Sequence, residues 1–211
     1  MEKTIRCADL LAYVSKSDVG AINHLFRQDG YVVATDGHIL LRVKESAVAD
    51  GETVQAQDAP NVARVMPKEM MAKPRRLSVA KIEQALEQAP KVKAREECHD
   101  CGGSGFVTWR FEGEEDEYEK EDRCPCCHGR GYKETSGEPI PDPKQVYSIL
   151  NHEYETIHLQ RIISVMRNVT KTDYLTIVSS NTYVLMMQSG AMELLIAGGE
   201  LDAHGNIIKV I

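Results

Sequence analysis

The chain has 211 residues, of which 42% are hydrophobic, and a formal net charge of −7. It is long enough to bury a real core, as one domain with an insert or as two small domains. It has no apolar run long enough to cross a membrane, and its start, "MEKTIRCADL", lacks the layout of a signal peptide. We therefore expect a soluble, cytoplasmic protein with no membrane partner. The negative charge excludes a wholly basic nucleic-acid coat but allows a local basic face.

The first half, residues 1–75, is predicted to form a short strand, a helix and three strands. The stretch "TIRCADLLAYV" (4–14) has apolar residues at i, i+1 and i+4, which predicts a helix of about three turns. Apolar runs follow it, and the turn sequence "RQDG" (27–30) separates two of them.

Asp36 and His38 stand two residues apart within "YVVATDGHILL" (31–41). An Asp-His pair can chelate a metal or relay a proton, but both roles need further groups that the local sequence does not offer. Asp36-Gly37 is also a dipeptide favoured in two-residue hairpin loops, where both central residues need φ > 0. We predict such a hairpin turn rather than a catalytic or metal-binding pair.

A connecting segment, residues 76–94, contains the next predicted helix. The stretch "SVAKIEQALEQA" (78–89) begins at Ser78, a favourable N-cap, and ends before Pro90. Ile82 and Leu86 lie on one face of this helix, which leads into the cysteine-rich region.

Five of the six cysteines fall into two clusters, "CHDCGGSG" (98–105) and "CPCCHGRG" (124–131). In a reducing compartment, paired CxxC motifs are metal ligands more often than disulfides. Glycines after each pair allow a tight turn, so that backbone amides can point at the thiolates. Each motif continues as C-x-x-C-x-G-x-G and resembles the zinc-binding repeat of DnaJ-type co-chaperones, here as one pair. We predict one structural zinc ion in an insert at 95–135, bound by Cys98, Cys101, Cys124 and Cys127.

Other readings of these clusters remain open. Cys126 could be a substitute ligand or a reactive thiol, and His99 and His128 are close enough to be alternative ligands. A redox CxxC would need a lowered thiol pKa and a βαβ setting, neither of which is visible. Four sulfur ligands would leave the ion no open position, which argues against metal-assisted hydrolysis.

Between the two motifs, "FVTWRFEGEEDEYEKEDR" (106–123) begins with residues that alternate in character. This alternation predicts a hairpin arm. Acidic residues crowd positions 112–122 and would repel phosphates, so we do not expect this arm to bind nucleic acid. The acidic run is either a solvated surface or a surface for acidic docking or for mimicry of nucleic acid.

A proline-rich return, residues 136–152, leads to the second half, residues 153–211. There "TIHLQRIISVM" (156–166) repeats the pattern of "TIRCADLLAYV", and the same offset aligns Tyr183 with Tyr31. Two apolar strands around a Gly-containing turn follow again. The predicted fold is therefore α+β: a pseudo-twofold domain of two βαβββ halves that bury their apolar faces together, with a zinc-binding β-hairpin insert between them.

The second helix, predicted at 160–171, carries Arg161, Arg167 and Lys171 on its outward face. Three cations on a protein of negative net charge suit contact with phosphates. An ordinary solvated helix is the alternative, because the corresponding face of the first helix mixes Asp9 with Lys16.

The segment "VATDGHILL" (33–41) resembles the "ATDGHRLA" segment of bacterial DNA polymerase sliding clamps. Weaker likenesses are "VMPKEMM" (65–71) to the clamp "IPRK" segment and "IPDPKQVYSIL" (140–150) to "FPDYRRVLP". The resemblance covers the two halves but not the insert. It implies a single clamp-like domain whose helices face duplex DNA.

In that family the segment is not catalytic but lines a groove that receives short motifs from polymerases and other partners. The resemblance places such a groove at Thr35, Gly37, His38 and Leu40. Two departures affect it: Ile39 stands where the family has Arg, and "IAGGELDAHG" (196–205) replaces the family's C-terminal "MPM".

No phosphate-loop, dinucleotide-binding, zinc-protease or serine-hydrolase motif is present in the sequence. We expect a non-enzymatic, clamp-like accessory protein of DNA replication or repair, from a phage or other mobile element. Its expected partners are double-stranded DNA, contacted without sequence specificity, and a DNA polymerase or another replication or host protein. The alternative is an interaction factor, an inhibitor or decoy of a host protein, that presents the acidic zinc arm.

A clamp-like role also requires copies of the chain to associate. We expect a homo-oligomer, a hexamer ahead of a dimer, joined through "HILLRVK" (38–44) and "MELLIAG" (192–198) as the outer strands of the sheet.

Overall fold

The computed structural model describes residues 5–16, 22–49, 59–112, 117–181, 183–198, 201 and 206–211. Within it the chain forms two compact units, which we call the body and the insert. The body contains Met1–Ala89 and Pro143–Ile211, and the insert contains Pro90–Asp142.

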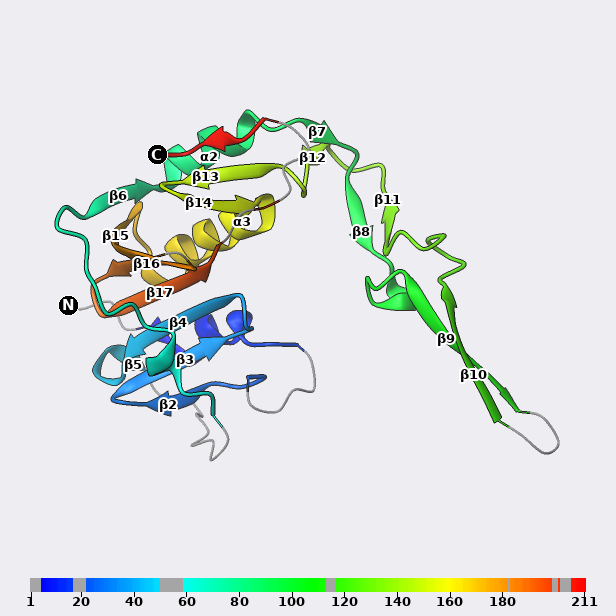
Figure 1. The fold of residues 1–211 in the computed structure, drawn as a ribbon, viewed down its shortest axis with the longest axis horizontal. Coiled ribbons are helices and arrows are strands. Elements are labelled where there is room, and N and C mark those ends of the chain that lie inside the picture. Colours follow the sequence, from blue (N-terminus) through cyan, green and yellow to red (C-terminus); the bar gives the residue numbers. More distant parts are fainter. Residues whose placement is uncertain are drawn as a thin grey trace. The chain divides into compact units, whose positions relative to one another are not determined.

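The body is built around a seven-stranded sheet (Figure 1) with the order β2-β3-β4-β17-β16-β15-β6. Every neighbouring pair in this sheet is antiparallel. The strands are β2 (Phe26–Gln28), β3 (Tyr31–Thr35), β4 (Ile39–Lys44), β17 (Met192–Ala197), β16 (Val184–Ser189), β15 (Tyr174–Ser180) and β6 (Arg75–Ser78).

Strands β4 and β17 are neighbours inside the sheet, where Leu40 lies opposite Leu195 and Leu41 opposite Leu194. The expectation that 38–44 and 192–198 form its outer edges is therefore wrong. Both strands are apolar at most positions because both of their faces are covered, which is typical of central strands. The outermost strands in the described part of the chain are β2 and β6.

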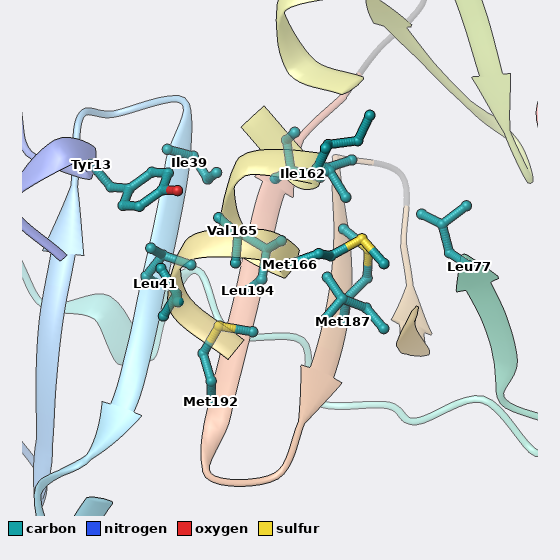
Figure 2. Packing of buried hydrophobic residues seen from close by; sticks show 14 of the residues in the cluster. Tyr13, Ile39, Leu41, Leu77, Ile162, Val165, Met166, Met187, Met192 and Leu194 are labelled. Carbon is teal, nitrogen blue, oxygen red and sulfur yellow. The ribbon is translucent and has the colours of Figure 1, made fainter. Parts of the chain in front are cut away.

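Successive side chains of these strands enter two different apolar cores, as the alternation of a pleated strand requires. In β4, Ile39 and Leu41 enter the larger core and Leu40 enters the smaller one. Figure 2 shows the larger core, in which Ile162 and Met166 lie among residues of the sheet.

The helices of the body cover one face of the sheet, since each contributes residues to the larger core. Helix α3 (Thr156–Ser164) continues directly into a π-helical turn, η5 (Val165–Thr170), so the helix predicted at 160–171 begins earlier than expected. Helix α1 (Cys7–Leu10) is followed by a 3-10 turn, η1 (Leu11–Tyr13). It is shorter than the predicted three turns because the backbone becomes extended again at Val14.

Two segments of the body share one element order. The first runs β1 (Ile5–Arg6), α1, η1 and β2 to β4, and the second runs β14 (His152–Glu155), α3, η5 and β15 to β17. Each is a strand, a helix and three strands, as predicted for each half. The pseudo-twofold relation between the halves stays a prediction.

Residues 59–71 cover the opposite face of the sheet. The 3-10 turn η3 (Val62–Arg64) places Val62 in the smaller core. The backbone N–H of Val62 donates to the side-chain oxygen of Gln28 at 3.0 Å, and that of Met71 donates to the carbonyl of Val178 at 2.7 Å. These bonds attach the segment to β2 and β15, which lie toward opposite ends of the strand order.

The connecting helix α2 (Val79–Glu87) begins as predicted, because the Ser78 hydroxyl accepts a hydrogen bond from the Lys81 amide at 3.3 Å. The smaller elements of the body are η2 (Glu45–Ala47), β5 (Val48–Ala49), β13 (Val146–Ile149) and β18 (Ile208–Lys209). Strand β5 pairs with β1, and β13 lies between β14 and β18. Among the described helices, none combines the length and apolar character needed to span a membrane.

The insert consists of three strand pairs and a short 3-10 turn, η4 (His99–Cys101). Its strands are β7 (Lys91–Val92) with β12 (Ile140–Pro141), β8 (Arg95–Glu97) with β11 (Tyr132–Glu134), and β9 (Phe106–Glu112) with β10 (Glu117–Arg123). The pairing of β9 with β10 confirms the predicted hairpin arm. Its acidic tip, residues 113–116, lies outside the described residues.

Candidate functional site

Asp36 closes the turn between β3 and β4 with its side chain. Its Oδ1 atom accepts hydrogen bonds from the backbone amides of His38, at 2.9 Å, and Ile39, at 3.0 Å. Its Oδ2 atom forms an ion pair with Arg161 at 2.7 Å. Both carboxylate oxygens are therefore engaged, and the turn interpretation of Asp36 and His38 is confirmed.

The geometry of this turn differs from the predicted two-residue loop. Gly37 has a positive φ of 92°, but Asp36 does not. The predicted conformation occurs instead at Asp29-Gly30, between β2 and β3, where φ is 52° and 77°. The predicted loop would need two successive left-handed residues. In the observed turn only Gly37 of this dipeptide is left-handed, and the Asp36 carboxylate stabilises the turn by accepting hydrogen bonds from backbone amides.

An apolar pocket of about 270 Å³ lies beside the turn. All four residues predicted to form a partner groove, Thr35, Gly37, His38 and Leu40, line it. Small-molecule pockets commonly measure ~300–1,000 Å³, so this one suits a few side chains better than a large cofactor. That a partner binds here stays a prediction.

Other parts of the chain complete the pocket, and sequence reasoning did not select them. They are Ile22, Ile39, Pro60, Asn61, Val62, Val65, Val184, Leu195 and Ala197. Residues 60–65 reach the pocket because their segment covers the smaller core. The sequence signal that could have identified this segment was the likeness of "VMPKEMM" (65–71), which begins at Val65, to a clamp segment. In the segment 196–205, which replaces the "MPM" segment of the clamp family, Ala197 lines the pocket. Residues 199–200 and 202–205 of this segment lie outside the described residues.

The three cations predicted to contact DNA have carboxylates nearby. Arg161 pairs with Asp36, and Arg167 pairs with Glu83 of α2. The pKa of Asp9 is lowered mainly by its hydrogen bond with Arg6, and Lys171 contributes to the same shift. This helix face is therefore less strongly positive than the sequence of α3 and η5 alone indicates.

The insert brings four cysteine sulfurs together. The Sγ atoms of Cys98 and Cys124 are 3.9 Å apart, those of Cys101 and Cys127 are 3.8 Å apart, and all four lie within 4.8 Å of one another. A tetrahedral ion with metal–sulfur bonds of ~2.3 Å requires sulfur–sulfur separations of ~3.8 Å. The four predicted ligands are therefore arranged to hold one metal ion.

Backbone amides support the sulfur cluster as the sequence predicts. The Gly105 amide donates to the Cys101 sulfur at 3.3 Å, and the Gly131 amide donates to the Cys127 sulfur at 3.2 Å. A Cβ atom at Gly131 would lie 2.2 Å from the carbonyl oxygen of Gly103. The two motifs thus approach each other too closely for any side chain at this position.

The alternative ligands do not join the cluster. Within the described residues, the only group of possible metal ligands contains the four cysteines and neither His99, His128 nor Cys126. Cys126 is exposed, and the nearby Asp100 carboxylate raises the pKa of its thiol. The carboxylate therefore favours the protonated thiol of Cys126 over the thiolate, which is the nucleophilic form.

No family model matches the chain, and no curated protein does. Among solved structures, the chain is similar to DNA polymerase III subunit beta from Borrelia burgdorferi, with 10% identity, a TM-score of 0.48 and coverage of 92% of this chain and 61% of that one. It is also similar to the sliding clamp of Pseudomonas aeruginosa (12% identity, TM-score 0.45, coverage 92% and 64%). A third is the Helicobacter pylori beta clamp bound to a DNA ligase peptide (9% identity, TM-score 0.47, coverage 92% and 62%). The chain spans less than two thirds of the length of each of these clamps.

Proposed function

We propose that this protein is a clamp-like accessory factor of DNA replication or repair that binds short apolar segments of partner proteins in the pocket. One observation carries the proposal: four residues of "VATDGHILL" that match the clamp segment, Thr35, Gly37, His38 and Leu40, line a single apolar pocket. A DNA polymerase or another replication protein would supply the bound segment. An origin in a phage or mobile element belongs to the same proposal, since a minimal clamp unit with an added insert suits such a genome.

The proposed role is binding rather than catalysis. Of the described residues that line the pocket, His38 is the one with an acidic or basic side chain. The neighbouring Asp36 carboxylate is held by two amides and by Arg161. Among the described residues that line the pocket, no second acid or base stands beside His38 to share proton transfer with it.

Contact with double-stranded DNA would use the helix face of Arg161, Arg167 and Lys171. Phosphates would have to compete with Asp36 and Glu83 for the two arginines. The Arg167–Glu83 pair is the more exposed, and exposed pairs contribute only ~0–1 kcal/mol. Replacing Glu83 by a phosphate as the partner of Arg167 would therefore cost little free energy. Without base contacts this binding would be independent of sequence and sensitive to salt.

We also propose that the metal held by the insert is zinc and that it is structural. A four-thiolate tetrahedral site is typical of structural zinc. Four protein ligands leave no coordination position for a substrate, so the ion would stabilise the insert and take part in no reaction.

The second candidate function is an interaction factor that presents the arm of the insert to a host protein. Two observations favour it: Arg161 and Arg167 already have carboxylate partners, and Trp109 and Tyr118 of the arm are exposed. The acidic residues around them would direct the arm to a basic protein surface. Binding of duplex DNA with a steep salt dependence separates the two candidates, because the interaction factor needs none.

A single substitution in the pocket tests the proposed function. Val65 lines the pocket and is 50% exposed, so Val65→Asp should leave the fold intact and place a charge where apolar side chains would bind. We expect a fluorescein-labelled peptide, Ala-Leu-Ala-Leu-Phe, to bind the native protein and to lose at least ~tenfold in affinity for the variant, or ~1.4 kcal/mol. The measurement is fluorescence anisotropy.

Met70→Asp is the matched control, since Met70 is an exposed apolar residue of the same segment that does not line the pocket. Equal effects of the two substitutions, or no binding by the native protein, would count against the pocket as the binding site.

A further inference from the structure

Asp36 connects the pocket to helix α3. Its Oδ1 atom closes the turn through the amides of His38 and Ile39, and its Oδ2 atom holds the guanidinium of Arg161 at 2.7 Å. Gly37 and His38 of that turn line the pocket, whereas Arg161 does not. Arg161 is thus linked through one carboxylate to a wall of the pocket.

A second turn in the same sheet shows that closing such a turn requires no charge. Between β15 and β16, the Asn181 side-chain oxygen accepts hydrogen bonds from the amides of Tyr183 and Val184, both at 2.9 Å. The Asn181 amide donates to the Val184 carbonyl at 3.2 Å, as the Asp36 amide donates to the Ile39 carbonyl at 3.3 Å. A neutral amide therefore closes the same turn, and among the described residues the second oxygen of Asp36 pairs with Arg161 alone.

The Asp36–Arg161 pair is more sheltered than the other ion pair of α3 and η5. The exposed fractions of the Arg161 and Asp36 side chains are 34% and 14%, against 57% and 42% for Arg167 and Glu83. Water and salt weaken an interaction between charges less when the charges are shielded. The Asp36–Arg161 pair is therefore the better suited of the two to hold a backbone segment in place.

We propose that Arg161 is a positioning residue of the pocket: by holding Asp36 it fixes the turn at 36–38, and with it the wall formed by Gly37 and His38. This inference rests on the proposed function of the pocket. Without the guanidinium the turn still closes through Oδ1, but it is free to shift against α3. A bound segment must then order the wall as it binds, which lowers affinity.

A double-mutant cycle tests the link. Arg161→Gln removes the cation, and Asp36→Asn keeps an oxygen for the two amides but removes the charge. With the labelled Ala-Leu-Ala-Leu-Phe peptide, we expect each variant to bind ~tenfold more weakly and the double variant to be no weaker than either, because both remove one interaction. Arg161→Lys should restore part of the affinity. Lys81→Gln removes an equal charge from an exposed position of helix α2 that does not line the pocket, and this variant should bind the peptide as the native protein does. Native affinity for Arg161→Gln, or effects that add in the double variant, would overturn the proposal.

Hydrogen exchange tests the same link without any ligand. In Arg161→Gln, the amides of His38 and Ile39 should exchange at least ~threefold faster, because a turn released from α3 opens more often. The amides of Tyr183 and Val184 are an internal control and should be unchanged, since Asn181 has no such cation. Unchanged exchange at His38 and Ile39 would overturn the positioning role. Failure of the native protein to bind the peptide would instead contradict the proposed function, so the two failures are distinguishable.

Discussion

Individual glycines allow the two cysteine motifs to pack closely against each other. Gly105 and Gly131 have φ of 80° and 77°, and a Cβ atom at either would lie within 2.5 Å of a carbonyl oxygen of the other motif. Gly102 also has a positive φ, of 54°, but a Cβ atom there would meet nothing within 4 Å. His128 occupies the equivalent place in the second motif with the same φ of 54°, so this position tolerates a side chain.

Gly131→Ala should therefore impair metal binding far more than Gly102→Ala. The first substitution combines an unfavourable φ with a clash against backbone, whereas the second carries only the cost of the left-handed conformation, ~1 kcal/mol. We expect at least a ~tenfold greater loss of zinc affinity for Gly131→Ala, measured by competition with a chromogenic chelator. Equal affinities of the two variants would show that close approach of the motifs is not required.

At the scale of elements, the insert has almost no apolar core. Among its described residues, the buried apolar side chains are those of Cys98, Cys124 and Cys127, with Val107 half-buried against them. Hydrophobic burial of this extent does not offset the conformational entropy of ordering the strands. Strand pairing and ion pairs such as Lys93–Glu134 contribute to the insert, and coordination of the proposed metal would supply much of its remaining stability.

Removal of the metal should unfold the insert and leave the body folded. The body buries its own large core, which contains none of the four cysteines of the insert. Upon addition of a chelator we expect amide NMR signals of residues 95–132 to collapse toward random-coil positions, while signals of β3, β4 and β17 stay in place. Cys126→Ser should retain the metal, because Cys126 lies outside the four-sulfur group. An insert that stays ordered without metal would contradict this account.

At the scale of the whole molecule, the expected assembly of copies would depend on the strands that end the sheet. Copies of the chain would join through β2 and β6, because β4 and β17 are already paired with each other. Unpaired edge strands favour association with another chain, although both of these edges are short.

We expect light scattering to show a closed homo-oligomer whose population rises with protein concentration. Arg27→Pro, in the middle of β2, should shift the protein toward the monomer, because proline removes a backbone donor and disturbs pairing at an edge. The exposed Arg64, in the segment over the opposite face, provides a control as Arg64→Ala. A strict monomer at every concentration would exclude the oligomer.

Features encoded in short stretches were predictable from the sequence. The Ser78 cap of α2, the four cysteines and the arm follow from local patterns, and the pocket residues at 35–40 follow from a resemblance. The position of β4 and β17 was missed, although their nearly continuous apolar character is typical of strands buried on both faces. The Asp36–Arg161 pair was not predictable, since it joins residues far apart in sequence through the packing of helix α3 on the sheet.

Binding of an apolar segment in the pocket can be measured by an NMR titration with the Ala-Leu-Ala-Leu-Phe peptide. We expect saturable shifts centred on the amides of Thr35, Gly37, His38, Leu40, Val65 and Leu195, with signals of the insert unchanged. Shifts centred on the arm at 106–123, or no shifts in the pocket at saturating peptide, would contradict binding in the pocket.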